Sequence, residues 1–159
     1  MDITRLLQEN QILCKVKAPA SKEQLLEMMA ETLVKGNVVT MRQDFLDAVL
    51  RRENEMTTQT QGGIALPHAC HSSVNKLGLA IATVDGDGIA FADGADCNCK
   101  LLFMIAIPEA TPAAHIPLYS FLADFILNSG SLDKLMATES ASEVVELFKK
   151  WQESTTQKQ

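Results

Sequence analysis

The chain has 159 residues, of which 47% are hydrophobic and 21% charged. This length is typical of a single domain that buries its own core, and the composition excludes an intrinsically disordered protein, which combines low hydrophobicity with high net charge. A formal net charge of -6 argues against a nucleic-acid-binding protein, because such proteins carry a basic face. The chain contains only 3 histidines, the side chains whose charge changes most readily near neutral pH.

Neither a signal peptide nor a membrane span is expected. The first eleven residues carry charges at Asp2, Arg5 and Glu9, which leaves no room for the apolar core of a signal peptide. The longest strongly apolar run, 101–107, is far shorter than the roughly 20 residues that cross a bilayer. We therefore expect a cytoplasmic protein whose cysteines are reduced thiols. These are Cys14, Cys70, Cys97 and Cys99.

Two helices are predicted in the first third of the chain. A weak strand over 12–16 is broken at 18–20, and Ser21 begins a helix with capping-box spacing that ends at Gly36-Asn37. The same spacing from Thr40 to Gln43 predicts a second helix, which ends in the charged residues 51–53.

Short apolar segments separated by turns dominate the middle of the chain, and helical periodicity returns after them. Beyond a polar loop at 54–63, strands are predicted at 64–66, 77–84, 89–91 and 99–107. Helices are predicted from His115, over 132–136, and from a third capping box at 140–143. This order predicts an α/β fold, a single-domain three-layer sandwich in which helices flank a short mixed β-sheet of about five strands. The domain spans residues 1–153, and 154–159 form a polar C-terminal tail.

His68 is the first candidate for chemistry. It ends the segment Gly62-Gly63-Ile64-Ala65-Leu66-Pro67-His68, in which the glycines permit tight backbone and Pro67 holds Leu66 extended. Because the Leu66-Pro67 dipeptide is stiff, the side chain of His68 is presented to a binding partner in a fixed orientation. The alternative is an ordinary surface histidine at the end of a strand.

His115 and Arg52 are weaker candidates when each is taken alone. His115 precedes an amphipathic helix, a common place for a structural histidine. Arg52 ends the second helix, where the helix dipole favours a cation whatever the function.

Metal sites are alternatives with little support. His68, Cys70 and His71 lie together, as do Cys97 and Cys99, but their spacings differ from those of zinc sites. The acidic turns lack the EF-hand calcium spacing. Their carboxylates are Asp85, Asp87, Asp93 and Asp96.

The segment from Gly63 to Ala69 resembles the phosphorylation-site motif of fructose/mannitol-type EIIA domains of the bacterial sugar phosphotransferase system, including their nitrogen-regulatory members. Arg52-Glu53 followed by Thr57-Thr58 is similar to the segment that precedes this motif, and Ala114-His115 to the second active-site histidine. The resemblance covers roughly residues 3–150. One departure is Gln61, which stands where the family often has glycine.

The resemblance implies that His68 accepts a phosphoryl group from phospho-HPr and passes it to an EIIB component. It also implies that Arg52 and His115 assist the transfer, that Thr58 and Gly63 bind phosphate or shape the loop, and that neither metal nor cofactor is needed. Nucleic acid is not a partner, and a membrane is involved only through an EIIC transporter. The alternative is a regulatory protein that uses the same His68 to control partner proteins. The sequence does not identify the sugar.

Overall fold

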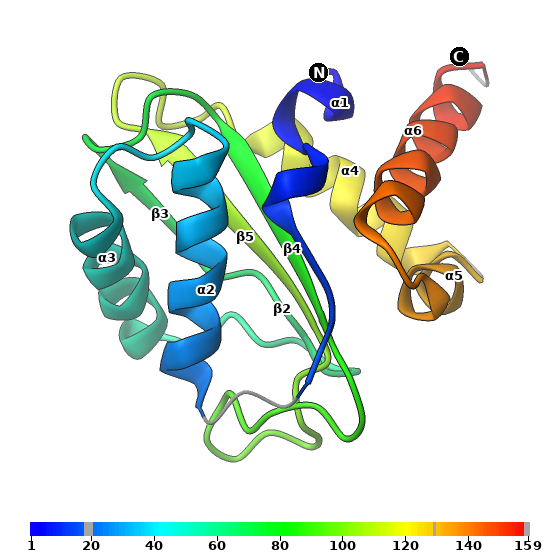
Figure 1. The fold of residues 1–159 in the computed structure, drawn as a ribbon, viewed down its shortest axis with the longest axis horizontal. Coiled ribbons are helices and arrows are strands. Elements are labelled where there is room, and N and C mark those ends of the chain that lie inside the picture. The colour runs from blue at the N-terminus through cyan, green and yellow to red at the C-terminus, as the bar shows by residue number, and fades with distance from the viewer. Residues whose placement is uncertain (18–20, 129, 158–159) are drawn as a thin grey trace.

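The computed structural model describes residues 1–17, 21–128 and 130–157, and it shows one sheet between two layers of helices (Figure 1). The elements in chain order are α1 (Ile3–Leu6), the 3-10 helix η1 (Glu9–Gln11), β1 (Ile12–Val16), α2 (Lys22–Lys35), α3 (Arg42–Glu55), β2 (Ile64–Ala65), β3 (His68–His71), β4 (Gly78–Val84), β5 (Leu101–Pro108), α4 (Ile116–Leu127), α5 (Ser131–Ala137) and α6 (Ala141–Gln157). Every helix in the described part of the chain is too short or too polar to span a membrane.

The sheet is mixed and has five strands in the order β1-β4-β5-β2, with β3 also paired to β5. β4 and β5 are antiparallel, whereas the other pairs are parallel. β2 and β3 follow one another along the same edge of β5, because Ile64 pairs with Leu101 and His68 pairs with Ile105. Pro67 therefore interrupts an edge strand, a position where its missing N–H is tolerated.

The side chains of β5 alternate between two apolar cores, as strand geometry requires. Leu102, Met104 and Ala106 pack under α2 and α3, while Phe103 and Ile105 pack under the helices of the other layer. In Figure 1, α2 and α3 cover one face of the sheet, and α1, α4, α5 and α6 lie beyond the other. The three-layer α/β sandwich with about five strands is confirmed.

Three local predictions differ from the structure. The sequence places His68 at the end of a short strand over 64–66, but β2 ends at Ala65 and His68 begins a strand of its own, β3. The expected strand 89–91 is reduced to one bridge between Ile89 and Cys99. The capping box at Thr40 is wrong, because the Thr40 hydroxyl donates to the carbonyl oxygen of Ser73, 3.0 Å away, and Met41 occupies the N-cap position.

The ends of the chain are more ordered than the sequence predicts. α1 and η1 occupy a segment for which no element was expected. α6 continues to Gln157, so residues 154–157 of the expected polar tail are helical. The expected break at 18–20 and the final two residues lie outside the described residues. The cap at Ser21 is confirmed, since its hydroxyl accepts from the backbone N–H of Gln24 at 3.1 Å.

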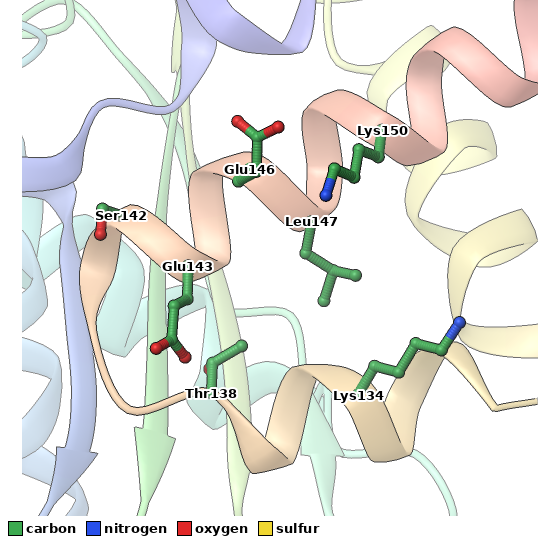
Figure 2. A pocket seen from close by; sticks show the side chains of 7 residues that line it. All are labelled: Lys134, Thr138, Ser142, Glu143, Glu146, Leu147 and Lys150. Atoms are coloured by element: carbon green, nitrogen blue, oxygen red, sulfur yellow. The ribbon is translucent and has the colours of Figure 1, made fainter.

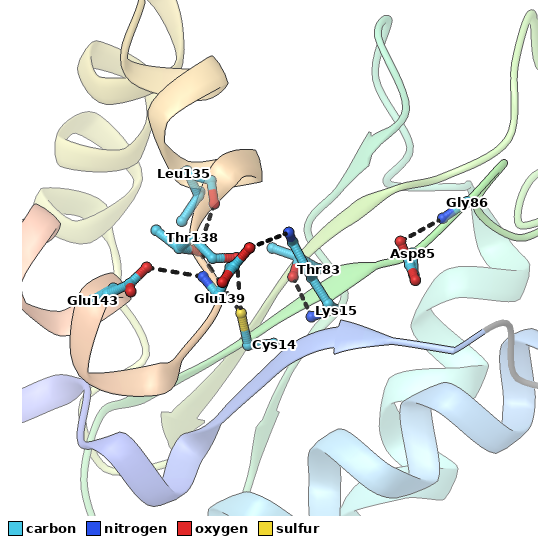
Figure 3. A network of polar contacts seen from close by, with 9 residues as sticks. All are labelled: Cys14, Lys15, Thr83, Asp85, Gly86, Leu135, Thr138, Glu139 and Glu143. Carbon is cyan, nitrogen blue, oxygen red and sulfur yellow. Dashed lines mark hydrogen bonds and ion pairs between the residues drawn. The ribbon is translucent and has the colours of Figure 1, made fainter.

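A bulge in β1 ties this edge strand to the segment between α5 and α6 (Figure 3). Lys15 adopts a left-handed φ of 51°, and its backbone N–H donates to Thr83 Oγ1 at 2.7 Å. Its ammonium lies 3.7 Å from Glu139, and Cys14 Sγ donates to the Thr138 carbonyl oxygen at 3.2 Å. A covered and bulged edge resists pairing with another strand.

Candidate functional site

A hollow of about 400 Å³ opens where the end of α3, the strand β3 and the start of α4 meet. His68, His115 and Arg52, the three residues predicted to carry the chemistry, all line it. The other lining residues are Ala48, Arg51, Glu55, Ala69, Cys70, Ile107 and Pro112. The fold thus brings together side chains that the sequence alone could only place separately.

His68 owes its orientation to the edge strand. It pairs with Ile105, whose side chain belongs to the core on the α4 side of the sheet, so His68 faces the same side. Its Nδ1 atom lies 2.8 Å from the carbonyl oxygen of Leu66. A carbonyl oxygen only accepts hydrogen bonds, so Nδ1 carries the proton of the neutral ring and Nε2 keeps a free lone pair.

The surroundings of His68 keep its ring neutral. Burial lowers the pKa of His68, and its electrostatic interactions with Arg52 and His115 lower it further, whereas the Leu66 carbonyl and Glu53 act in the opposite direction. Burial is the largest of these effects. A neutral imidazole with a free nitrogen is a nucleophile at neutral pH.

Arg52 lies in the last turn of α3, half-buried beside His68. One of its Nη atoms donates to the carbonyl oxygen of Met56 at 2.8 Å, which caps the end of the helix and holds the side chain in place. The guanidinium keeps further N–H groups for another acceptor. A planar cation with free donors is suited to the oxygens of a phosphoryl group.

His115 stands at the N-cap of α4, directly before the first helical residue. Its Nδ1 atom is buried and meets no hydrogen-bond partner among the described residues. A buried N–H without an acceptor is rarer than an unpaired buried acceptor. The buried Nδ1 therefore favours the tautomer with its proton on Nε2, in which this ring can donate to a group bound in the pocket.

Tyr119 is a member of the site that the sequence did not reveal. Its ring meets His115 edge to face at 4.9 Å between centroids, and His68 in the same manner at 5.9 Å. Burial raises the pKa of Tyr119, while Arg52 lowers it in part. The i, i+4 spacing of His115 and Tyr119 on α4 was the signal that could have placed them on one face.

Thr58 and Gly63 stand behind the pocket rather than in its lining. Thr58 lies between Glu53 and the backbone of Leu66, with hydrogen bonds to both. Gly63 has a φ of 76°, and a side chain there would place its Cβ 2.5 Å from the carbonyl oxygen of Asn98. Both residues shape the segment that leads into His68.

The residues considered for metal binding are engaged separately. His71 Nδ1 lies 2.8 Å from Ser73 Oγ, and Cys70 is exposed on β3. Burial raises the pKa of the Cys99 thiol to about 12. Within residues 1–17, 21–128 and 130–157, His, Cys, Asp and Glu side chains form no group of three that could hold a metal ion.

A larger hollow, of about 620 Å³, lies between α5 and α6 (Figure 2). Its lining is made of Lys134, Thr138, Ser142, Glu143, Glu146, Leu147 and Lys150. This surface holds none of the nucleophilic candidates and lies on other helices than the His68 pocket. The His68 pocket is the smaller of the two, and the convergence of two histidines and an arginine is what makes it the candidate site.

The family described as phosphoenolpyruvate-dependent sugar phosphotransferase system, EIIA 2, matches residues 5–151. The chain belongs to this family. The fructose-specific EIIA component of Haloferax volcanii is 33% identical over 150 residues, which cover 93% of this chain and 97% of that protein. The fructose-specific EIIABC component of Bacillus subtilis is 29% identical, and the match spans 93% of this chain but only 23% of that longer protein.

Solved structures of EIIA proteins share the fold. The mannitol-specific IIA protein of Escherichia coli, solved in complex with phosphorylated enzyme IIB, has a TM-score of 0.75 at 28% identity, covering 89% of this chain and 96% of that one. The nitrogen regulatory protein IIA-Ntr of Neisseria meningitidis has a TM-score of 0.79 at 23% identity, covering 90% and 96%. This second likeness supports the fold alone. The resemblance inferred from residues 63–69 is confirmed.

Proposed function

We propose that this EIIA protein carries a phosphoryl group on Nε2 of His68, taken from the phosphohistidine of HPr and delivered to an EIIB component. The observation that carries the proposal is the pairing of a neutral His68, with Nε2 free, and the cation of Arg52 in one pocket. No step needs a metal or a cofactor. The proposed transfers take place in the cytoplasm, and a membrane enters only through an EIIC transporter.

The transfer is two displacements at the same phosphorus. The lone pair on Nε2 attacks, the N–P bond to HPr breaks, and its electron pair returns to the imidazole of HPr. A nucleophile of EIIB then attacks the phosphorus and releases His68. Nδ1 keeps its proton throughout and donates it in a hydrogen bond to the Leu66 carbonyl oxygen, so the ring returns to its starting state.

Arg52 and His115 support the charge that moves between these partners. The transition state for phosphoryl transfer is loose, with negative charge on the equatorial oxygens. Arg52 supplies charge-assisted N–H donors, and His115 supplies Nε2–H. Preorganised donors of this kind act without reorganising during the reaction.

A radioactive phosphate chase tests the proposal. The protein is incubated with labelled phosphoenolpyruvate, enzyme I and HPr, and then with a panel of EIIB components. We expect HPr-dependent label on the wild type and on His71→Ala, and none on His68→Ala. In the chase, the wild type should transfer its label to at least one EIIB. Equal labelling of His68→Ala would refute the proposal.

A regulatory role is the second candidate, in which phosphorylation of His68 itself is the output. It is favoured by the nitrogen regulatory protein of Pseudomonas aeruginosa, which is 27% identical over 131 residues covering 80% of this chain and 82% of that one. In the same chase, a protein that accepts label from HPr and passes it to no EIIB would favour regulation. Delivery to an EIIB favours sugar uptake.

A further inference from the structure

Glu53 is a buried carboxylate with both oxygens engaged. It lies in the last turn of α3, directly after Arg52, and only 5% of it is exposed. Oε1 accepts from Thr57 Oγ1 at 2.8 Å and from the backbone N–H of Thr58 at 2.7 Å. Oε2 accepts from Thr58 Oγ1 at 2.8 Å. Buried carboxylates are rare unless paired. The burial of Glu53 therefore suggests that its hydrogen bonds fix the segment they reach.

The hydrogen bonds continue from Thr58 to the segment before His68. The backbone N–H of Leu66 donates to Thr58 Oγ1 at 3.2 Å, and the carbonyl oxygen of the same Leu66 lies 2.8 Å from His68 Nδ1. Four residues between 53 and 68 thus form one chain of contacts, from Glu53 through Thr58 and Leu66 to His68. Both ends of it have limited solvent access.

The chemistry of the groups fixes the direction of each bond. A carboxylate can only accept, so the single hydroxyl proton of Thr58 points to Glu53. The oxygen of Thr58 is then left with lone pairs, which suit the N–H of Leu66. Because that proton is already committed, Thr58 has none to donate to a phosphoryl group.

We propose that Glu53 is a positioning residue for phosphoryl transfer, whose carboxylate acts through Thr58 and Leu66 to hold His68 with its proton on Nδ1 and Nε2 facing the pocket. The role in transfer rests on the proposed function of His68, but the effect of Glu53 on the His68 ring does not depend on that function. The tautomer and orientation of His68 are properties of the unphosphorylated protein. They can be measured whether or not HPr is the donor.

The competing explanation is that Glu53 only stabilises the end of α3 and the loop after it. That role would lower the stability of the protein without changing the ring of His68 in the folded fraction. Glu53→Gln separates the two, because the amide has one accepting oxygen and one donating nitrogen where the carboxylate has two acceptors. The amide oxygen can still accept from Thr57 and from the Thr58 N–H, but the amide nitrogen donates and cannot accept the Thr58 hydroxyl proton, so that hydroxyl loses its fixed direction.

The experiment is nitrogen-15 NMR of the histidine rings in folded, unphosphorylated protein, combined with the kinetics of transfer from phospho-HPr. In the wild type we expect His68 to show a protonated Nδ1 and a bare Nε2. In Glu53→Gln we expect a mixture of tautomers and a fall in kcat of about 10- to 100-fold, with a much smaller change in KM. Asp47→Asn, an exposed carboxylate on the same helix, is the matched control.

Substitutions of Thr58 and Thr57 provide a second, independent test. Thr58→Val removes the hydroxyl that reaches Leu66 and should reproduce the effect of Glu53→Gln, whereas Thr58→Ser should restore the wild-type tautomer. Thr57→Val breaks a bond to Glu53 that does not lead to His68, and it should leave the tautomer unchanged. The double variant of Glu53→Gln and Thr58→Val should be no worse than either single one, because both cut the same chain.

The tautomer of His68 tests the role of Glu53, and the label taken from phospho-HPr tests the proposed function. If folded Glu53→Gln or Thr58→Val keeps the wild-type tautomer of His68, the inference is wrong, even if the rate of transfer falls. If the tautomer changes as expected but the wild type takes no label from phospho-HPr, the positioning chain stands and the proposed donor is wrong.

Discussion

The Nδ1 atom of His68 lies 2.8 Å from the carbonyl oxygen of Leu66, two residues earlier in the chain. This contact links the local conformation of the Leu66-Pro67 dipeptide to the chemistry of the site. Because the acceptor is a carbonyl, the contact determines which ring nitrogen is free to react. The remaining site residues then act on a nucleophile whose direction is already set.

The low pKa of His68 predicts how phosphoryl acceptance depends on pH. Only the neutral ring is a nucleophile, so the rate of acceptance should be constant above the pKa of His68 and fall as the pH drops below it. Since burial and Arg52 lower this pKa from the usual value of 6.5, activity should persist to a lower pH than for an ordinary histidine. The rate of transfer from phospho-HPr, measured against pH, checks this.

Removal of the Arg52 charge should move that profile in a known direction. Arg52→Gln takes away a cation that disfavours protonated His68, so the pKa of His68 should rise and the acidic limb should move to higher pH. An NMR titration of His68 measures the shift directly. Arg42→Gln, which removes a cation that pairs with Glu27, should leave it in place.

The same substitution should slow phosphoryl transfer far more than it weakens the fold. Loss of one preorganised donor to the transition state typically costs about 100-fold in kcat. The bond from Arg52 to Met56 is exposed, so the free energy of unfolding should fall by about 1 kcal/mol or less. Single-turnover kinetics and urea denaturation measure the two effects. Unchanged transfer would remove Arg52 from the mechanism.

Gly63 and Gly62 provide a matched test of the loop before His68. Both have positive φ, but a Cβ at Gly63 meets the Asn98 carbonyl oxygen at 2.5 Å, whereas a Cβ at Gly62 meets nothing within 4 Å. Gly63→Ala should therefore destabilise the protein by about 3 kcal/mol, through strain and a backbone clash. Gly62→Ala should cost about 1 kcal/mol from backbone strain alone. Equal urea midpoints for the two variants would contradict this account.

Tyr119 is the only tyrosine of the chain and should report the state of His68. A phosphoryl group on His68 places negative charge near a phenol whose ring lies 5.9 Å away between centroids. Negative charge disfavours the tyrosinate, so phosphorylation should raise the pKa of Tyr119 further. The near-ultraviolet absorbance of the phosphorylated and unphosphorylated forms, followed against pH, measures this. The difference should be missing from His68→Ala and present in His71→Ala.

Local patterns predicted most of the fold, because burial repeats with the period of each element. The continuous apolar run that became β5 and the capping box at Ser21 are examples. The pattern failed where a distant residue competes for a local group. The Thr40 hydroxyl fits a helix cap, but it donates to Ser73, 33 residues away.

The residues that meet in the candidate pocket could be named from the sequence, but their geometry could not. His68, His115 and Arg52 could be named from the motif and its surroundings. Tyr119 was missed: its i, i+4 spacing places it on one face of α4 with His115, but its contact with His68 depends on how α4 lies against β3. The strand that begins at His68 was also missed, since proline usually ends a strand and only an edge position tolerates it.

The central claim is that His68 reacts through Nε2 because Leu66 holds its other nitrogen. The direct measurement is the nitrogen-15 and phosphorus-31 NMR spectrum of ring-labelled protein, phosphorylated with phosphoenolpyruvate, enzyme I and HPr. We predict phosphorus coupled to Nε2 of His68, with Nδ1 still protonated. Phosphorus on Nδ1, or on any residue other than His68, would contradict the account.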